Sequence, residues 1–347
     1  MIFEGKILTR TIQSLDHINL EWLNETLQRV EEFKDNRAID LNVKRVGEGI
    51  GQLGEFALLE LKLKNGDDLN LFLKIQTDTE DMDNVAKDYQ FYIREVKFYN
   101  NLSSQINVKT PKPYYVEHDE ISGRVLLLLE YMDGWYSPDQ IEGASVKEIE
   151  LAIEGLIPIS SQFWGTVRDI EWIPDMKESY MLKIVDDMVE YQPEFLNRFG
   201  HLMTDSRKKL LDKIVNYYPN FPQILSDGIL TLTHWDYRVE NLFFTPNVDD
   251  ITVIDWQLMM ANKPGWDLAY LLCTNVQIDI RREIFKESCE VYLQGLKKNG
   301  IDFAKDEINK NMMISLLAMM TFPVVGGANY DLENMRSKKL FEVFTER

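Results

Sequence analysis

Cysteine and histidine are both scarce in this sequence. Cys273 and Cys289 stand sixteen residues apart, with no Cys-x-x-Cys pair and no cluster of histidines beside them. Zinc sites and disulfide scaffolds need closely spaced cysteines or many of them. The sequence therefore indicates neither class. Two isolated cysteines are typical of a reducing compartment, and we expect a cytoplasmic protein.

Basic residues are also in short supply. Lysine and arginine number 38 against 57 acidic residues, which gives a net charge of −19. This balance opposes binding to nucleic-acid phosphates and to anionic lipid surfaces, so we expect neither partner. The simpler explanation of the negative net charge is that it keeps the protein soluble. An acidic cleft that attracts a cationic substrate is the alternative, because total charge does not say where the charges lie.

No hydrophobic run is long enough to suggest a membrane span. The longest, residues 314–328, has about fifteen residues and includes Pro323 and Gly326, whereas a bilayer needs about 20 apolar residues. A buried helix followed by a turn fits it better. The N-terminal residues 1–6 lack a basic segment followed by an apolar run, so we expect no signal peptide.

The length of the chain indicates two folded lobes. A chain of 347 residues exceeds the size at which one hydrophobic core keeps growing. Neither an internal repeat nor a low-complexity segment interrupts it. We expect an N-terminal lobe over residues 1–132 and a C-terminal lobe over residues 133–347.

The pattern of the N-terminal lobe predicts a small antiparallel sheet with one long helix. An amphipathic helix is expected over residues 20–33, and three strands over residues 41–76, with a hairpin turn at Asn65-Gly66. Apolar residues at alternating four- and three-residue steps predict a helix over residues 84–102. Residues 124–132 read as a buried strand that leaves the lobe.

The C-terminal lobe reads as mainly helical. Ser145-Val-Lys-Glu148 is a capping box that opens an apolar-periodic run to about residue 164. Further helices are expected within residues 175–218 and 280–345. A strand-rich island, residues 231–256, lies between them. Together the two lobes predict an α+β, bilobal fold.

One motif carries the strongest chemical signal. The segment His234-Trp-Asp236-Tyr-Arg-Val-Glu-Asn241 follows the pattern H-x-D-x-x-x-x-N, and Asp255 ends an apolar strand fourteen residues later. Phosphoryl transfer needs a carboxylate beside the attacking hydroxyl and oxygen ligands that hold Mg²⁺ on the nucleotide phosphates. Asp236 suits the first task, and Asn241 and Asp255 suit the second. The simpler alternative is that all three are turn or strand-end residues.

This segment resembles the catalytic core of the aminoglycoside phosphotransferase and choline kinase superfamily, including its ecdysteroid-kinase-like branch. Gly265-Trp-Asp267-Leu-Ala-Tyr-Leu-Leu272 resembles the usual continuation, in which the aspartate is mainly structural. The resemblance covers most of the chain and implies a protein-kinase-like fold. It implies Asp236 as catalytic base, with His234 bracing its loop, and Asn241 and Asp255 as Mg²⁺ ligands.

One residue departs from the family pattern. The family usually has glycine between the histidine and the aspartate, whereas this chain has Trp235. A large ring at this point would reshape the catalytic loop or form the floor of a substrate site. The departure bears on the choice of substrate more than on catalysis.

Lys74 and Glu95 are a candidate buried ion pair in the N-terminal lobe. Strand alternation places Lys74 on a half-buried face, and Glu95 falls on the apolar stripe of the helix that follows. Burying either charge alone is costly, so each needs a partner. A kinase-like fold uses such a pair to position the nucleotide phosphates. A surface role for Lys74, and Asp88 as a competing partner, are the alternatives.

A glycine-rich turn precedes the second strand. Gly49, Gly51 and Gly54 lie where backbone N–H groups could cover phosphates. Their spacing matches G-x-G-x-x-G, but the dinucleotide-binding version requires a helix after the turn, and residues 56–63 read as a strand. A Walker A motif is excluded because Glu55 and Phe56 stand where lysine and serine or threonine belong.

The connection between the lobes is a candidate adenine site. The resemblance implies hydrogen bonds from adenine to main-chain groups around Glu130 and Met132, although an apolar strand end explains the same residues.

These observations predict a phosphotransferase that uses ATP and Mg²⁺ to phosphorylate a hydroxyl of a small molecule, in the manner of aminoglycoside, choline or ecdysteroid kinases. A protein substrate is less favoured, because the D-F-G and A-P-E motifs of protein kinases are absent and Asp255-Trp256-Gln257 replaces the first. The alternative is a catalytically silent protein that keeps the kinase fold for nucleotide binding or as a scaffold.

Overall fold

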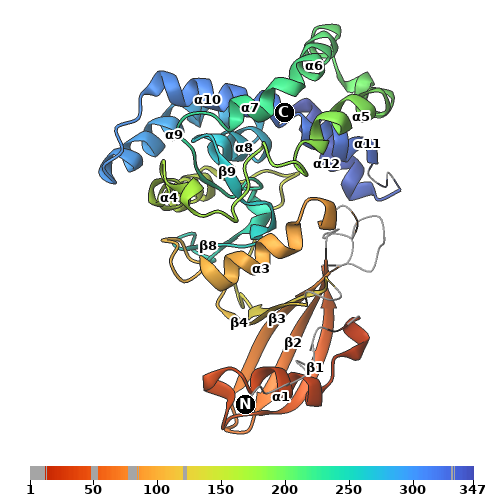
Figure 1. Ribbon diagram of the computed structural model, residues 1–347, viewed down its shortest axis with the longest axis vertical. Helices are drawn as coiled ribbons and strands as arrows, with labels where there is room; N and C mark the ends of the chain where they lie inside the picture. The colour runs from red at the N-terminus through yellow and green to blue at the C-terminus, as the bar shows by residue number, and fades with distance from the viewer. Residues whose placement is uncertain are drawn as a thin grey trace, which may run out of the picture. The chain divides into compact units, whose positions relative to one another are not determined.

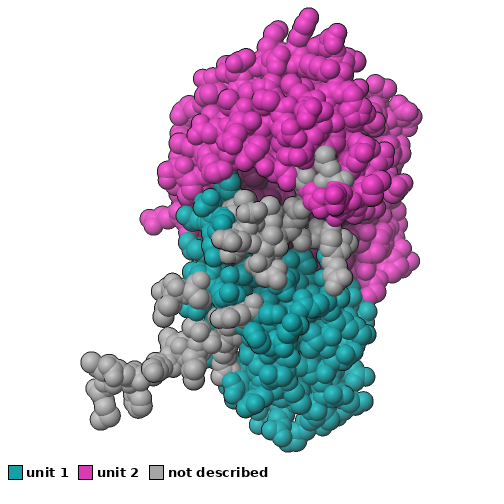
Figure 2. All heavy atoms as spheres, turned by 90° about the vertical axis from the view of Figure 1, so that its right-hand side faces the viewer, with its two compact units in different colours: residues 1–105, 110–133 teal, residues 106–109, 134–347 magenta. Residues whose placement is uncertain are grey.

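The chain forms two compact units. The computed structural model describes residues 12, 14–47, 54–76, 84, 86–119, 123–329, 331 and 333–347. Unit 1 consists of Met1–Gln105 and Thr110–Asp133, and unit 2 consists of Ile106–Lys109 and Gly134–Arg347 (Figure 2). The main boundary therefore falls one residue after the one expected from the sequence. The predicted phosphate-covering residues Gly49 and Gly51 lie outside the described residues.

Unit 1 is built on a five-stranded antiparallel sheet (Figure 1). Its strands are β1 (Ala38–Val46), β2 (Glu55–Leu63), β3 (Asp68–Ile75), β4 (Pro113–His118) and β5 (Val125–Glu130), in the order β1-β2-β3-β5-β4. The three predicted strands and the strand that ends at Glu130 are present. The edge strand β4 was not predicted.

Helices α1 (Leu20–Leu27) and α3 (Phe91–Asn101) accompany the sheet in the described part of unit 1, and both differ from the prediction in extent. Helix α1 is capped by Asn19 and ends six residues early, with a short 3-10 turn at Glu31–Phe33. The predicted helix over residues 84–102 is interrupted: residues 86–88 are helical, but α3 begins anew after Gln90, which takes a left-handed conformation with φ 57°. The prediction of one continuous helix was therefore wrong, whereas its helical character was right.

Unit 2 is mainly helical, as predicted. Its helices are α4 (Val146–Gln162), α5 (Lys183–Phe199), α6 (Asp205–Tyr217), α7 (Phe221–Leu225), α8 (Trp266–Thr274), α9 (Ile278–Lys298), α10 (Lys305–Ala318), a π-helix (Phe322–Gly326), α11 (Gly327–Asn329) and α12 (Met335–Glu346). Two small antiparallel pairs complete it: β6 (Thr231–Thr233) with β9 (Met260–Asn262), and β7 (Leu242–Phe244) with β8 (Ile251–Val253). The sequence did not predict β9.

The predicted capping box opens α4. The Ser145 hydroxyl accepts a hydrogen bond from the Glu148 N–H at 3.3 Å, and the Glu148 carboxylate accepts one from the Ser145 N–H at 2.7 Å. Two backbone donors that the helix leaves unsatisfied are thus paired, which fixes where α4 begins.

The apolar region near the C-terminus is longer than the sequence suggested. Lys305–Asn329 forms a helical run of 25 residues with a mean hydropathy of 1.5 in its most apolar window, enough by length and composition to cross a membrane. However, 56% of that window is buried inside the protein. Core helices of folded domains have the same composition, and the packing of α10 on α8 agrees with that role.

Candidate active site

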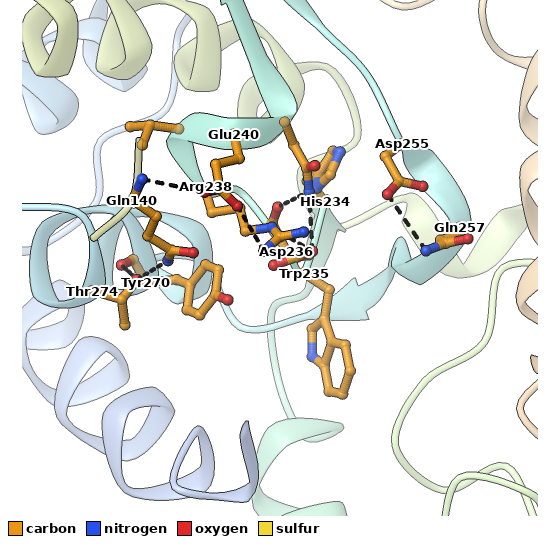
Figure 3. Close-up of polar contacts among 12 residues, drawn as sticks. Gln140, His234, Trp235, Asp236, Arg238, Glu240, Asp255, Gln257, Tyr270 and Thr274 are labelled. Carbon is orange, nitrogen blue, oxygen red and sulfur yellow. Dashed lines mark hydrogen bonds and ion pairs between the residues drawn. The ribbon is translucent and has the colours of Figure 1, made fainter. Parts of the chain in front are cut away.

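The predicted catalytic loop connects β6 to β7 in unit 2 (Figure 3). Strands β7 and β8 pair with Leu242 opposite Val253. One residue beyond that pair, the Ile254 N–H donates to the Asn241 carbonyl at 3.0 Å. Asn241 and Asp255 are therefore at the adjacent ends of one hairpin, although fourteen residues separate them. The Asn241 amide nitrogen also donates to the Asp236 carboxylate at 3.0 Å and to its carbonyl at 2.9 Å.

His234 connects the catalytic loop to the end of β8. Its side chain is fully buried, and Nε2 lies 2.9 Å from the Ile254 carbonyl, so the ring donates there. The ring also contacts Trp256 edge-on, with 4.8 Å between the centroids. Burial lowers the pKa of His234, which keeps the ring neutral. These contacts brace the loop.

Asp267 holds the same loop from the opposite side. It lies in the first turn of α8, and its two carboxylate oxygens accept the backbone N–H groups of His234 at 2.7 Å and of Trp235 at 2.9 Å. Burial raises its pKa to about 7, against the two N–H groups, which act to lower it. The structural role that the resemblance implied for this aspartate fits these contacts.

Trp235 adopts a backbone conformation that favours glycine. Its φ is +72°, in the left-handed region. The indole is only 4% exposed and stacks on Trp266 with the rings 7° from parallel, 5.4 Å apart. It also contacts Phe322 at the start of the π-helix. The backbone thus keeps a conformation suited to glycine, while the side chain joins the aromatic core of unit 2.

Asp255 begins the 3-10 turn at Trp256–Leu258 and is half-buried. Its φ is +62°, a conformation that aspartate tolerates better than most residues. The Gln257 amide donates to its carboxylate at 3.4 Å (Figure 3). The left-handed turn directs the chain away from β8 immediately after this carboxylate.

Unit 1 contains the predicted ion pair. Lys74 Nζ on β3 lies 2.6 Å from a Glu95 carboxylate oxygen on α3, and the two side chains are 6% and 2% exposed. The Lys74 ammonium also lies 5.9 Å from the centre of the Phe56 ring. Asp88, the alternative partner, is exposed. The pairing of Lys74 with Glu95 is therefore confirmed.

Gly54 is the one of the three predicted phosphate-covering glycines that lies within the described residues. It begins the approach to β2, and a Cβ at this position would lie 3.0 Å from the Ile75 carbonyl and 3.1 Å from the Phe56 ring. A side chain would therefore push β2 away from β3. This packing need accounts for Gly54 independently of any ligand.

Glu130 and Met132 lie at the end of unit 1. Glu130 is the last residue of β5, where its N–H donates to the Lys112 carbonyl at 2.8 Å and its carboxylate accepts from the Lys112 N–H at 3.1 Å. Met132 is buried. The adenine contacts expected from the resemblance stay a prediction.

Two further charged residues belong to the catalytic loop and were not singled out from the sequence. Arg238 lies 3.3 Å from the Asp236 carboxylate and 3.1 Å from that of Glu240. The only sequence signal was the alternation of acidic and basic residues at 236, 238 and 240. This signal is common on exposed segments and therefore carries little information by itself.

Comparisons with known proteins agree with this geometry. Residues 168–302, less than half of the chain, match the sequence model of the Ecdysteroid kinase-like family. The match includes the catalytic loop, Asp255 and Asp267. A search of curated protein sequences finds no significant match.

Solved structures of small-molecule kinases share the fold. The GDP complex of wild-type aminoglycoside 2'-phosphotransferase-IIIa aligns with a TM-score of 0.55 and 14% identity, over 94% of this chain and 99% of that one. Ethanolamine kinase from Plasmodium vivax aligns with a TM-score of 0.51 and 13% identity, over 87% of this chain and 82% of that one. Amicoumacin kinase with AMP-PNP, Ca²⁺ and its ligand aligns with a TM-score of 0.50 and 15% identity, over 86% of this chain and 87% of that one.

The fold is therefore the α+β fold of these kinases, as the sequence predicted: an antiparallel sheet in one unit and a helical second unit. The resemblance to the aminoglycoside phosphotransferase and choline kinase superfamily is confirmed, and the matched segment resembles its ecdysteroid-kinase-like branch.

Proposed function

We propose that this protein is an ATP- and Mg²⁺-dependent phosphotransferase that transfers the γ-phosphate to a hydroxyl of a small molecule. The observation that carries the proposal is the placement of Asn241 and Asp255 at adjacent ends of one short hairpin, with Asp236 hydrogen-bonded to Asn241. The buried ion pair of Lys74 and Glu95 supports it independently, since such a pair positions nucleotide phosphates in kinase-like folds.

Asp236 is the proposed catalytic base. Its carboxylate orients the acceptor hydroxyl and takes its proton as the acceptor oxygen forms a bond to the γ-phosphorus. The bond between that phosphorus and the β,γ-bridging oxygen breaks, and ADP leaves. His234 and Asp267 would act on this step through the backbone, because Asp267 accepts the N–H groups of His234 and Trp235 and the His234 ring is bound to the Ile254 carbonyl.

Asn241 and Asp255 are the proposed ligands of Mg²⁺. An amide oxygen and a carboxylate are hard oxygen donors, and Mg²⁺ in nucleotide sites takes one or two protein ligands together with phosphate oxygens. The Asn241 nitrogen is occupied by Asp236, which leaves the amide oxygen as its donor to a metal. When bound, Mg²⁺ would neutralise the charge that develops on the phosphates.

Lys74 is proposed to contact the α- and β-phosphates, with Glu95 fixing its direction. Gly49, Gly51 and Gly54 would cover the phosphates, and main-chain groups near Glu130 and Met132 would bind adenine. These roles come from the resemblance. The AMP-PNP and GDP bound to structurally similar kinases support a purine nucleotide as cofactor, and the choice of ATP comes from the resemblance.

A small-molecule alcohol is the proposed acceptor. The structurally similar enzymes act, by their names, on aminoglycosides, ethanolamine and amicoumacin. The matched family is named for a relation to kinases of ecdysteroids, which are lipophilic alcohols. A cytoplasmic location fits the nucleotide requirement and the two unpaired cysteines.

Phosphoryl transfer across a panel of acceptors tests the proposal. ADP release from Mg²⁺·ATP would be measured with amino alcohols, aminoglycosides, sugars and sterols, using the wild type and Asp236→Asn. We expect one acceptor class to accelerate ADP release, and the substitution to slow the transfer by about 10²- to 10⁴-fold. A wild type that neither binds nor turns over ATP, or a variant with an unchanged rate, would contradict it.

The silent-scaffold alternative rests on Trp235, the one departure in the catalytic loop. Thermal unfolding separates the two functions. A competent site predicts that ATP stabilises the protein only when Mg²⁺ is present, whereas a silent site predicts stabilisation that is indifferent to Mg²⁺.

A further inference from the structure

A chain of five alternating charges runs from the proposed base to the last long helix of unit 2. Asp236 contacts Arg238 at 3.3 Å, and Arg238 contacts Glu240 at 3.1 Å (Figure 3). Glu240 also pairs with Arg336 of α12, and Arg336 donates to the Asp139 carboxylate at 2.6 Å. Each inner member thus lies between two opposite charges.

The inner part of this chain is shielded from solvent. The Asp236, Arg238 and Glu240 side chains are 12%, 24% and 14% exposed, whereas Arg336 and Asp139 are 38% and 39% exposed. Exposed ion pairs contribute little to stability, but shielded ones with good geometry constrain their partners. The contacts from Asp236 through Arg238 to Glu240 are therefore the most restrained part of this series of ion pairs.

Two nitrogen atoms of the catalytic loop lie close to the same oxygen of the proposed base. Arg238 Nε makes an ion pair with Asp236 Oδ2 at 3.3 Å, and the Asn241 amide nitrogen donates a hydrogen bond to it at 3.0 Å. Together the two contacts restrain the rotation of the carboxylate. Orienting a reacting group in this way lowers the entropic part of a reaction barrier.

Helix α12 supplies the far anchor. Asn334 caps its first turn, where the side chain accepts the N–H groups of Arg336 at 3.1 Å and Ser337 at 3.2 Å. Arg336 is therefore placed by a fixed helix start. Glu240 also accepts the Gln140 N–H at 3.4 Å, which adds a second restraint on the same carboxylate.

We propose that Arg238 is a positioning residue for Asp236, and that Arg336 maintains Arg238 in place through Glu240. Arg238 would fix the direction of the carboxylate, and α12 would stabilise that arrangement from outside the catalytic loop. The role rests on the proposed phosphotransferase function, because it concerns the same base.

Steady-state kinetics of four variants test this coupling, with Mg²⁺·ATP as the substrate and ADP release as the readout. We expect Arg238→Gln to lower kcat by about 10- to 100-fold, as a misplaced reacting group does, with little change in the KM for ATP. Arg238→Lys should recover part of the loss. Arg336→Gln should lower kcat by a smaller factor. The double variant Arg238→Gln/Arg336→Gln should have the same kcat as Arg238→Gln alone, since both residues act on Asp236 through one path.

Arg198→Gln is the matched control. Arg198 is also 24% exposed and pairs with Glu194 within α5, far along the chain from the catalytic loop. Its free energy of unfolding in urea should fall by about as much as that of Arg238→Gln, while its kcat stays unchanged. An unchanged kcat in Arg238→Gln, losses that add up in the double variant, or an equal loss in the control would overturn the proposal.

A spectroscopic measurement separates this proposal from the function on which it rests. Protein labelled with ¹³C at aspartate Cγ gives a signal for Asp236, identified by its absence in Asp236→Asn. That signal should move in Arg238→Gln and in Arg336→Gln but not in the control. If the wild type shows no turnover, the phosphotransferase function fails, but the ¹³C signal still shows whether Arg238 positions the Asp236 carboxylate. A signal that stays in place in both variants would overturn the positioning.

Discussion

At the scale of single residues, Trp235 shows how this chain tolerates a strained conformation. A left-handed φ costs a residue with a Cβ about 1 to 2 kcal/mol. The stacked ring of Trp266, the hydrogen bond from its indole N–H to the Trp235 carbonyl at 3.1 Å, and the contact with Phe322 all oppose that cost. The side chain therefore stabilises the loop that its backbone conformation destabilises.

This balance predicts an unusual order of stability. Trp235→Gly and Trp235→Ala both lose the aromatic stack, but glycine removes the left-handed strain, so it should be more stable than alanine by about 1 kcal/mol. Tyr292, buried within α9, is the control, where alanine should be the more stable by about 1 kcal/mol. Urea unfolding measures both pairs. The same order at the two positions would contradict the role of φ.

The buried pair in unit 1 gives a second prediction. Lys74→Met should lower the free energy of unfolding by about 3 to 5 kcal/mol, because the Glu95 carboxylate stays buried after losing its cation. Lys74→Met/Glu95→Gln should be more stable than the single variant.

The exposed pair of Lys44 and Glu60 on the same sheet is the control. These side chains are 53% and 34% exposed, so Lys44→Met should cost at most about 1 kcal/mol. Urea titration of all three variants checks the order. A double variant less stable than Lys74→Met would show that Glu95 needs no cation.

At the scale of elements, Asp267 couples α8 to the catalytic loop and makes stability depend on pH. Its pKa in the folded protein is about 7, above the ordinary value of about 4. Between about pH 4 and pH 7, the folded state therefore retains the proton on Asp267, while the unfolded state releases it. The stabilisation is complete below pH 4 and falls by about 1.4 kcal/mol per unit as pH rises to 7.

Asp267→Asn should remove that dependence. The difference in free energy of unfolding between wild type and variant should shrink from pH 5 to pH 7 in urea titrations. The variant should also be less stable at pH 5 by about 1 to 3 kcal/mol, because an amide accepts one of the two N–H groups and leaves the other unpaired. Parallel curves for the two proteins would contradict the shifted pKa.

The start of α4 offers a test of local sequence rules. Ser145→Ala removes the hydroxyl that accepts the Glu148 N–H, whereas the backbone N–H of residue 145 can still donate to the Glu148 carboxylate, so the change should cost about 1 kcal/mol. Thr204→Ala, which removes the side-chain cap of α6, should cost a similar amount. Thermal unfolding of the two variants gives the comparison, and an unchanged stability in Ser145→Ala would contradict the role of the capping hydroxyl.

Elements with a long periodic pattern were the ones that could be predicted. The pattern of α4 and its capping box located that helix, and alternation located β1 to β3. The edge strand β4 was missed because Pro111 precedes it, Pro113 begins it, and all its residues are half-buried, so no alternation appears. The break before α3 depends on the conformation of Gln90, a residue type with no strong preference for it.

The same reasoning explains which parts of the site were found. Periodicity placed Lys74 and Glu95 on facing stripes, and motif spacing located Asp236, Asn241 and Asp255. The contribution of Arg336 could not be predicted, because it lies 96 residues from Glu240 and meets it only through the packing of α12. Long-range ion pairs leave no local pattern in a sequence.

At the scale of the whole molecule, the proposed function requires the hairpin of unit 2 to hold a metal-bound nucleotide. The fold matches that of small-molecule kinases over almost the full length of the chain at low sequence identity. Fold alone does not establish catalysis. In the proposed function, the oxygen donors of Asn241 and Asp255 would distinguish a working site from a retained fold.

Calorimetric titration of ATP with and without Mg²⁺ tests this requirement most directly. We predict that Mg²⁺ tightens ATP binding by the wild type and by Asp249→Asn, a control in the turn of the same hairpin. Asp255→Asn should lose most of that gain while its Mg²⁺-free binding stays the same, because one negative ligand is removed. ATP affinity that is absent, or equal with and without Mg²⁺ in the wild type, would contradict the account.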